Sequence, residues 1–264
     1  MESKAIALFM ATREELEPFL SLCSSQWRWG VPLEGIGSPA PTIWHLRLDG
    51  VRVLACISGM GPQRAQWAAR AIVRRFKPCC LLSAGFCGGL APELRSGEIV
   101  GLETLLDGVY AQPSLICLQA FYGAREACCQ HLPAEQLFPI TSGTALTTPQ
   151  IVDTVRAKAK IRSTFGADIV DMELSSIASV AKEFSLPWGG VKVVSDPADR
   201  GMPLDFGPLL DDRGQVDRFQ IAAALLRHPG ALWGLCRLGY EAPRAARNLA
   251  RFLAFYLPNL AYYL

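Results

Sequence analysis

The sequence repeats one pattern, in which a short apolar segment ends in a glycine-rich or acidic turn and a helical segment follows. Such apolar segments span residues 4–10, 51–57, 80–83 and 188–194. Their length and composition predict strands, and strands alternating with helices predict an α/β fold. We expect a single three-layer domain in which helices flank a central mixed, twisted sheet. Ligands of such sheets bind at the carboxyl ends of the strands, so the residues that follow these segments are the first candidates for a functional site.

Turn residues divide the rest of the sequence into predicted elements. Asp49-Gly50 is a dipeptide favoured in tight turns, and it predicts a hairpin over residues 42–57. The run Gly59-Met60-Gly61-Pro62 ends the second hairpin strand, and its proline suits the first turn of a helix over 63–76. The other predicted elements are strands at 137–141 and 169–170 and helices at 14–22, 149–160 and 173–183.

The composition of the chain excludes several classes of protein. Half of the 264 residues are hydrophobic, which is ample for one core, and the 26 Lys and Arg residues nearly balance the 24 Asp and Glu residues. This balance does not indicate a nucleic-acid partner. The nine cysteines form no CxxC pair and the three histidines are scattered, so we expect no metal, no other cofactor and a reducing cytoplasm. No apolar run predicts a signal peptide or a membrane-spanning helix.

The C-terminal part of the chain is rich in arginine and poor in acids. We therefore divide the chain into a catalytic domain over residues 1–205 and a basic amphipathic helical extension over 206–264. On a helix, one side of this extension carries Leu249, Phe252, Leu253, Tyr256 and Leu260, and the opposite side carries Arg244, Arg247 and Arg251. Such a helix packs on the enzyme body or a sister subunit, or it lies at a membrane surface. Pro258 is expected to interrupt it near its end.

Three carboxylates follow predicted strands or begin helices. Asp196 lies between an apolar strand and Pro197, a setting that can bury the carboxyl and raise its pKa enough for it to donate a proton. Glu173 begins a helix, where it can accept hydrogen bonds from sugar hydroxyls, and Glu15 follows the first strand, where it can orient a water. Each acid taken alone is consistent with a turn or helix cap, and the sequence does not separate Glu14 from Glu15. Together they can break an N-glycosidic bond, which needs a proton donor, charge stabilisation and a nucleophile.

Three ordered motifs carry a resemblance to a known family. They are Ser83-Ala84-Gly85-Phe86-Cys87-Gly88-Gly89-Leu90, Val170-Asp171-Met172-Glu173 and Val194-Ser195-Asp196-Pro197-Ala198-Asp199. From the first strand to about residue 200, the chain resembles the nucleoside phosphorylase and nucleosidase superfamily, especially the methylthioadenosine/S-adenosylhomocysteine nucleosidases. The resemblance implies that Asp196 donates a proton to the purine, Glu173 binds the ribose hydroxyls and Glu15 activates water. It also implies a homo-oligomer and a substrate pocket formed by Gly85, Phe86, Cys87, Leu146, Met172 and Ser195.

The sequence does not decide whether the nucleophile is water or phosphate. Arg13 interrupts the acidic cluster after the first strand, and Phe86 stands where these nucleosidases usually carry a small polar residue. A phosphorylase would need an anion site, and Gly59, Gly61 and Arg64 could form one at the start of a helix. Phosphate is therefore a candidate co-substrate.

The whole chain, with its extension, resembles one branch of this superfamily, the hopanoid-associated phosphorylases or adenosylhopane nucleosidases. The runs Gly59-Met60-Gly61-Pro62 and Ser195-Asp196-Pro197-Ala198-Asp199 and the Arg- and Leu-rich extension carry this resemblance. It implies release of adenine from adenosylhopane, a lipid-linked adenosine, with ribosylhopane or its phosphate as the other product. For such a substrate we expect a cytoplasmic enzyme in peripheral contact with the inner membrane surface through the extension.

Three alternatives stay open: a methylthioadenosine/S-adenosylhomocysteine nucleosidase, another purine nucleoside phosphorylase, and a catalytically inactive nucleoside-binding partner protein. Retention of Glu15, Glu173 and Asp196 together argues against the inactive protein. A dinucleotide-binding oxidoreductase is set aside, because Gly85-Phe86-Cys87-Gly88-Gly89 lacks the spacing GxGxxG.

Overall fold

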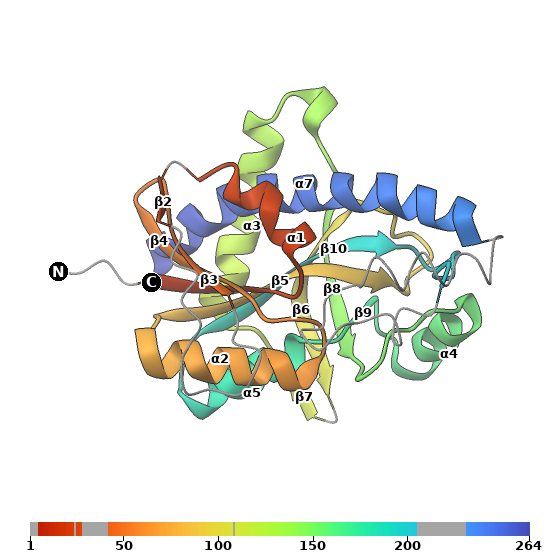
Figure 1. Ribbon diagram of the computed structural model, residues 1–264, viewed down its shortest axis with the longest axis horizontal. Coiled ribbons are helices and arrows are strands. Elements are labelled where there is room, and N and C mark those ends of the chain that lie inside the picture. The colour runs from red at the N-terminus through yellow and green to blue at the C-terminus, as the bar shows by residue number, and fades with distance from the viewer. Residues whose placement is uncertain (1–4, 24, 28–41, 108, 205–230) are drawn as a thin grey trace.

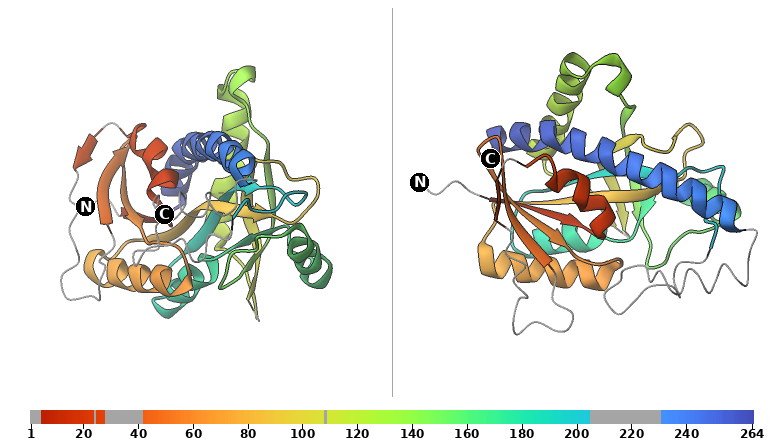
Figure 2. Two further views of the ribbon diagram at one scale, coloured as in Figure 1. Left: turned by 45° about the vertical axis from the view of Figure 1, so that its right-hand side comes forward. Right: turned by 45° about the horizontal axis from the view of Figure 1, so that its top comes forward.

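The computed structural model describes residues 5–23, 25–27, 42–107, 109–204 and 231–264. These residues form three layers, with helices on both faces of a mixed sheet (Figures 1 and 2). Helices α1 (Arg13–Leu20), α3 (Leu115–His131) and α7 (Ala231–Tyr263) cover one face, and α2 (Pro62–Phe76) and α5 (Leu174–Glu183) cover the other. This arrangement confirms the predicted three-layer α/β fold. The remaining described helices are α4 (Val155–Phe165) and the short 3-10 helix η1 (Ala134–Gln136).

The sheet combines an open half with a closed half. Its described strands are β1 (Ala5–Met10), β2 (Ser25–Trp27), β3 (Thr42–Leu48), β4 (Val51–Ile57), β5 (Cys80–Gly89), β6 (Ile99–Asp107), β7 (Val109–Ala111), β8 (Ile140–Thr147), β9 (Ile169–Asp171) and β10 (Trp188–Asp196). In the order β10-β6-β8-β9-β5, each strand pairs with the next, and β5 pairs again with β10. These strands therefore close on themselves, while β1, β4, β3 and β2 extend the sheet outward from β5.

Strand β1 shows how the sequence builds two cores. Its residues alternate between the faces of the sheet, as the period of a strand requires. Ile6, Leu8 and Met10 join the core under α1, α3 and α7. Ala5, Ala7 and Phe9 join the core against α2 and α5. A strand covered on both faces needs apolar residues at every position, which explains the uninterrupted apolar segment.

Several predicted elements are confirmed, and others have different bounds. The hairpin turns at Asp49 and Gly50, both with positive φ, and α2 spans Pro62–Phe76. The strand predicted at 137–141 begins only at Ile140 and continues to Thr147, because β8 pairs with both β6 and β9. The helix predicted at 149–160 spans Val155–Phe165 instead, because the Thr154 hydroxyl caps the backbone N–H of Ala157.

Helix α7 is part of the core rather than an appendage. The predicted apolar face is almost completely buried against the sheet and the helices α1 and α3, at no more than 1% exposure for Leu249, Phe252, Leu253, Tyr256 and Leu260. That face packs on the enzyme body, so it cannot also lie in a membrane. The helix continues through Pro243 and Pro258, so the predicted interruption at Pro258 is wrong. Residues 206–230 of the predicted extension lie outside the described residues, and no helix within the described ranges is long and apolar enough to cross a membrane.

Candidate active site

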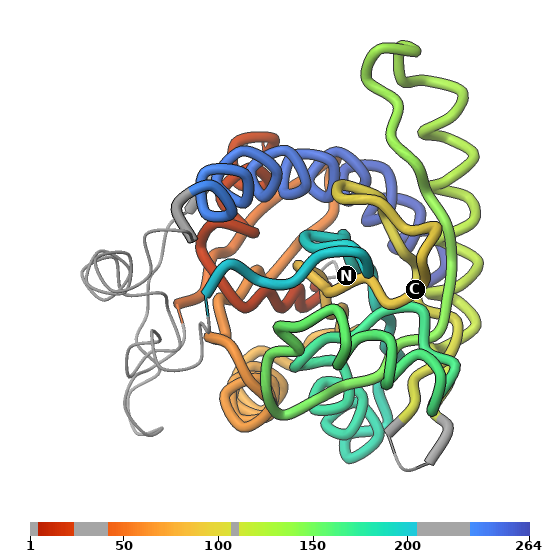
Figure 3. Tube along the Cα trace, turned by 90° about the vertical axis from the view of Figure 1, so that its right-hand side faces the viewer, coloured from red at the N-terminus to blue at the C-terminus, as the bar shows by residue number. Residues whose placement is uncertain are grey.

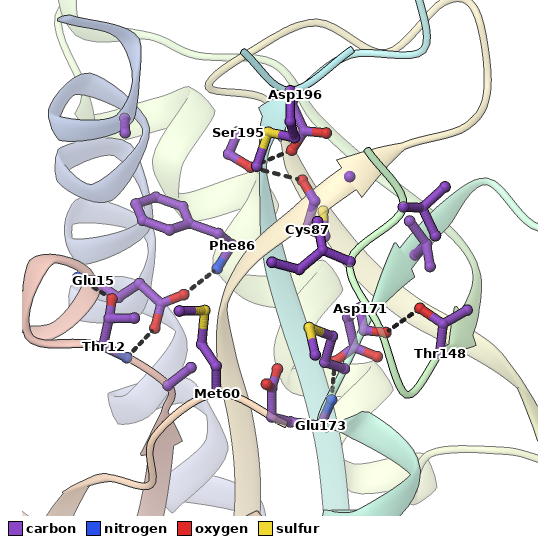
Figure 4. A pocket seen from close by; sticks show the side chains of 18 of the residues that line it. Thr12, Glu15, Met60, Phe86, Cys87, Thr148, Asp171, Glu173, Ser195 and Asp196 are labelled. Carbon is purple, nitrogen blue, oxygen red and sulfur yellow. Dashed lines mark hydrogen bonds between the residues drawn. The ribbon is translucent and has the colours of Figure 1, made fainter. Parts of the chain in front are cut away.

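A cavity of about 360 Å³ opens where the carboxyl ends of β1, β5 and β10 meet. Figure 3 looks onto this edge of the sheet, with α7 running across the top. The three predicted acids Glu15, Glu173 and Asp196 all line the cavity (Figure 4), although they come from α1, the start of α5 and the end of β10. The fold therefore brings together carboxyl groups that lie far apart in the sequence.

Glu15 is held by two backbone N–H groups. Thr12 and Glu15 form a capping box at the start of α1, in which Oε2 accepts a hydrogen bond from the Thr12 N–H at 2.8 Å. Oε1 accepts another from the Phe86 N–H at 2.8 Å. Burial raises the pKa of Glu15, and these N–H donors and the nearby Lys192 charge oppose that rise. Glu14 is exposed at the rim of the same cavity, so the buried carboxylate is that of Glu15.

Gly85 leaves room for the Glu15 carboxylate. Its backbone φ of +143° is disfavoured for a residue with a side chain, and a Cβ there would lie 2.8 Å from Glu15 Oε1. Gly85 thus supports the site from behind Glu15 without lining the cavity itself.

Glu173 points into the cavity from the start of α5. Asp171 Oδ2 accepts hydrogen bonds from the backbone N–H groups of Glu173 and Leu174, at 3.1 and 2.9 Å, which fixes this turn. The Glu173 Oε1 atom accepts a hydrogen bond from the Gly61 N–H at 2.8 Å. Burial raises the pKa of Glu173 to about 7, against the lowering effect of the Lys192 charge. Glu173 can therefore change its protonation state near neutral pH.

Lys192 is a buried charge that the sequence analysis did not single out. Its side chain is 2% exposed and its Nζ lies 2.9 Å from Asp171 Oδ2. Burial acts to lower the pKa of Lys192. The carboxylates of Asp171, Glu173 and Glu15 have a larger, opposite effect, so the pKa lies above its usual value. Lys192 therefore places a permanent positive charge beneath the cavity. The signal that could have found it is a single charged residue inside the apolar strand 188–194.

Asp196 is held by side chains at the end of β10. The pairing of β10 with β5 is irregular between Val194 and Asp196. There the Ser195 hydroxyl lies 2.6 Å from Asp196 Oδ1, to which it can donate. The Lys158 ammonium donates to Oδ2, also at 2.6 Å. Burial raises the pKa of Asp196, whereas Lys158 and Ser195 act to lower it. Lys158 was also missed, and its position on α4 gives no sequence signal of burial.

The other predicted pocket residues fall into two groups. Phe86, Cys87, Met172 and Ser195 line the cavity as expected. Leu146 lies outside it and packs with Leu90 and Val170. The apolar lining that was not predicted comes from Met60, Ile151, Val152 and Met202 and from Leu238 and Ala242 of α7.

The segment considered for phosphate uses its backbone donors elsewhere. The N–H groups of Ser58 and Gly59 donate to Met10 O and Ala11 O, at 2.9 and 3.0 Å, and the Gly61 N–H donates to Glu173. Arg64 donates to the Met60 carbonyl at 3.3 Å and does not line the cavity. Among the described residues, the cavity lining contains acids and no lysine or arginine, and no group of His, Cys, Asp and Glu is placed to hold a metal ion.

The mixed sheet thus brings three buried carboxyl groups around one cavity at its strand ends, an arrangement that can supply the acid and base chemistry of the nucleosidase and nucleoside phosphorylase class. The sequence model of the Phosphorylase superfamily matches residues 5–225, and the chain belongs to this family.

Solved structures share the fold at low sequence identity. The 5'-methylthioadenosine/S-adenosylhomocysteine nucleosidase of Colwellia psychrerythraea 34H, in complex with adenine, superimposes with a TM-score of 0.72 at 18% identity over 98% of this chain and 96% of that one. The nucleosidase of the same name from Neisseria meningitidis, in complex with methylthio-immucillin-A, gives 0.69 at 19% identity over 96% and 98%. The futalosine hydrolase of Helicobacter pylori superimposes with a TM-score of 0.68 at 18% identity, over 97% of this chain and 98% of that one.

Proposed function

We propose that this enzyme hydrolyses the N-glycosidic bond of a 5′-substituted adenosine and releases adenine. The observation that carries the proposal is the set of three buried carboxyl groups, one for each need of the reaction. The adenine and methylthio-immucillin-A bound by structures of the same fold support a purine substrate. Retention of all three acids also argues against a catalytically inactive binding protein.

In the proposed reaction, the protonated Asp196 carboxyl donates to a nitrogen of the departing base. The electron pair of the glycosidic bond then stays with the base, and the sugar develops positive charge that the nearby carboxylates stabilise. Glu173 accepts a hydrogen bond from a ribose hydroxyl. Glu15, fixed by the Thr12 and Phe86 N–H groups, takes a proton from the water that attacks the sugar carbon.

Water is the nucleophile we favour over phosphate. A bound phosphate needs unpaired N–H donors or cationic side chains. The segment that could have supplied them donates to Met10, Ala11 and Glu173 instead. The lining carboxylates would repel a phosphate anion, whereas a neutral water meets no such cost.

The 5′ substituent we propose is an apolar lipid, as in adenosylhopane, with ribosylhopane as the second product. Helix α7 contributes Leu238 and Ala242 to the cavity, next to Ile151 and Met202. An apolar lining of this kind favours an apolar substituent over a charged one. Methylthioadenosine and S-adenosylhomocysteine are the alternative substrates.

A product assay tests both the substrate and the reaction. Purified enzyme is incubated with adenosylhopane, methylthioadenosine or S-adenosylhomocysteine, each with and without phosphate, and adenine is measured by chromatography. We expect adenine and free ribosylhopane from adenosylhopane without phosphate. A strict phosphate requirement with a sugar 1-phosphate product would replace hydrolysis by phosphorolysis. Release of no base from any of these substrates would overturn the proposed function.

Peripheral membrane contact is proposed for the N-terminal half of α7. Trp233 and Tyr240 are 81% and 72% exposed there, and Arg244 and Arg247 are exposed further along the helix. Aromatic and basic side chains together favour an anionic lipid surface. We expect the double variant Trp233→Ser/Tyr240→Ser to lose cosedimentation with anionic vesicles, and Tyr262→Ser at the other end of α7 to keep it. Equal cosedimentation of all three proteins would contradict this part of the proposal.

A homo-oligomer is proposed as well. Leu115 and Tyr122 lie two turns apart on α3 and are 68% and 43% exposed, and we propose that this side of the helix contacts a sister subunit. Sedimentation velocity of the purified protein would show a single species larger than the 28.8 kDa chain. A species of monomer mass at all concentrations would reject the oligomer.

A further inference from the structure

Lys158 is the one buried residue of α4, and its environment is unusual for a lysine. Its side chain is completely buried, whereas the rest of this helix is exposed or half-buried. Its Nζ donates to Asp196 Oδ2 at 2.6 Å and to the carbonyl oxygens of Asp196, Pro197 and Arg200 at 3.0, 2.9 and 3.0 Å. All four acceptors belong to the last residue of β10 or to the segment that follows it. One ammonium group therefore holds both the Asp196 carboxyl and the backbone around it.

Burying a lysine without a partner is costly, so an ammonium in this position must be compensated. The compensation comes from one carboxylate and three carbonyl oxygens. The carbonyls could hold the segment in place with a neutral donor, but a full positive charge beside the carboxyl stabilises the ionised form of Asp196 more than a neutral donor does. Lys158 therefore affects the proton affinity of Asp196 as well as its position.

The other groups around Asp196 do not duplicate this charge. Ser195 offers a neutral hydroxyl, and burial raises the pKa of Cys87 on β5 well above its usual value, which keeps that thiol neutral. Lys192 on β10 is paired with Asp171. The Arg200 guanidinium pairs with Glu241 and Asp199, away from the Asp196 carboxyl.

We propose that Lys158 is a positioning residue for the proton-donating step, which holds the Asp196 carboxyl in place and stabilises the carboxylate left when the proton has moved to the base. In this step the O–H bond of Asp196 breaks, an N–H bond forms on the base, and the electron pair of the glycosidic bond goes to the base. Asp196 becomes an anion beside the Lys158 cation, and solvent returns the proton after turnover. The inference rests on the proposed function.

The test is the pH profile of Lys158→Met, with the exposed Lys160→Met on the same helix as the matched control. Without the ammonium, Asp196 holds its proton more tightly and is a weaker acid. We expect kcat on the purine nucleoside to fall about 10- to 100-fold, with KM within about threefold, and the alkaline limb of the profile to move up by at least about one pH unit. Lys160→Met should match wild type.

Two further measurements separate this role from a purely structural one. The first uses 4-nitrophenyl riboside, whose leaving group departs without protonation, so Lys158→Met should cost less than about threefold. The second places Lys158→Met in an Asp196→Asn background, where it should add less than about twofold. Lys158→Met could lower the melting temperature. Both the purine assay of the single variant and the comparison in the Asp196→Asn background can still be interpreted in that case.

An unmoved alkaline limb, or an equal loss on both substrates, would overturn the role of Lys158 while leaving the proposed function intact. A wild-type enzyme that releases no base would instead reject the proposed function.

Discussion

The two ends of the cavity hold their carboxyl groups by different means. At the proposed sugar end, Glu15 and Glu173 accept hydrogen bonds from the backbone N–H groups of Phe86 and Gly61, each at 2.8 Å. At the proposed base end, Asp196 is held by the side chains of Lys158 and Ser195, each at 2.6 Å. Both ends are buried.

This difference shows that orienting a carboxyl group and setting its proton affinity are separate tasks. A backbone N–H is fixed by the sheet and the helix starts, and it orients a carboxylate while adding only a partial charge. An ammonium adds a full charge, which changes how tightly the carboxyl holds its proton. The sugar end thus keeps its acids oriented, with a common Lys192 charge beneath them, whereas the base end has its own cation for a proton that must leave.

Replacing Glu15 by Gln is expected to have the largest effect. Glu15→Gln keeps the shape of the side chain but removes the base and one negative charge near the cationic sugar. We expect kcat to fall by up to about 10⁴-fold on the purine nucleoside and by a similar factor on 4-nitrophenyl riboside, because both need an activated water. Steady-state kinetics on both substrates measure this, with Glu17→Gln, an exposed acid of α1 that does not line the cavity, as the control. Retained activity in Glu15→Gln would show that another group activates the nucleophile.

Replacing Asp196 by Asn should show that the base end of the cavity acts on the leaving group and the sugar end does not. Asp196→Asn is expected to lower kcat about 10³-fold on the purine nucleoside and less than about 10-fold on 4-nitrophenyl riboside. The reason is that only the purine needs a proton in order to leave. The measurement is the ratio of kcat/KM on the two substrates, which should match that of wild type in a control with Asp199→Asn, an exposed acid beyond the site. Equal losses on both substrates would assign Asp196 a role other than proton donation.

The protonation of Glu173 should appear in the stability of the free enzyme. Its folded pKa of about 7 lies above the ordinary value of 4.5, so the folded state binds the extra proton, and the stability from this group is lost as the pH rises through 7. At about 1.4 kcal/mol per pKa unit, the loss between pH 5 and 8 is roughly 3 kcal/mol. We expect urea unfolding to show this loss in wild type and a smaller one in Glu173→Gln. Parallel pH dependence of the two proteins would contradict the assignment.

The smallest expected effect concerns the backbone behind the sugar end. Gly85→Ala places a Cβ 2.8 Å from Glu15 Oε1 on a backbone with φ of +143°. We expect kcat to fall about 10-fold or more on both substrates, because a carboxylate displaced by a fraction of an ångström loses its orientation. Gly166→Ala, where a Cβ meets nothing within 4 Å, is the control for the general cost of positive φ. If kcat falls equally in Gly85→Ala and Gly166→Ala, the close approach of residue 85 to the Glu15 carboxylate does not contribute to activity.

The sequence predicted the parts of the fold that have strong local signals. Strand β1, the hairpin and α2 follow from continuous apolar runs and from Asp49-Gly50 and Gly61-Pro62 at their ends. No element was predicted for residues 99–131, where β6 and α3 lie. Helix α3 buries small residues such as Ala120, Ala124 and Cys128, which give a weak apolar pattern.

The site was predictable to the extent that its residues stand in ordered motifs. Glu173 and Asp196 belong to such motifs, and the structure places both in the cavity with Glu15. Lys158 could not be predicted in the same way, because a lysine on a helix looks like a solvent-exposed residue, and the signal for Lys192 was only its place as the single charge within an apolar strand. Their burial follows from partners on other elements, Asp196 and Asp171, which only the tertiary structure brings close.

The buried C-terminal helix has a consequence for synthesis of the protein on the ribosome. The sheet face under α7 is not fully covered until Leu260, which has no exposed surface, has been made and has packed. At about 5 to 20 residues per second, translation from the end of β10 to this residue takes roughly 3 to 13 s. During that interval the strands are complete but one apolar face is open to other chains. The nascent enzyme is thus most exposed to aggregation and to chaperone binding just before α7 emerges.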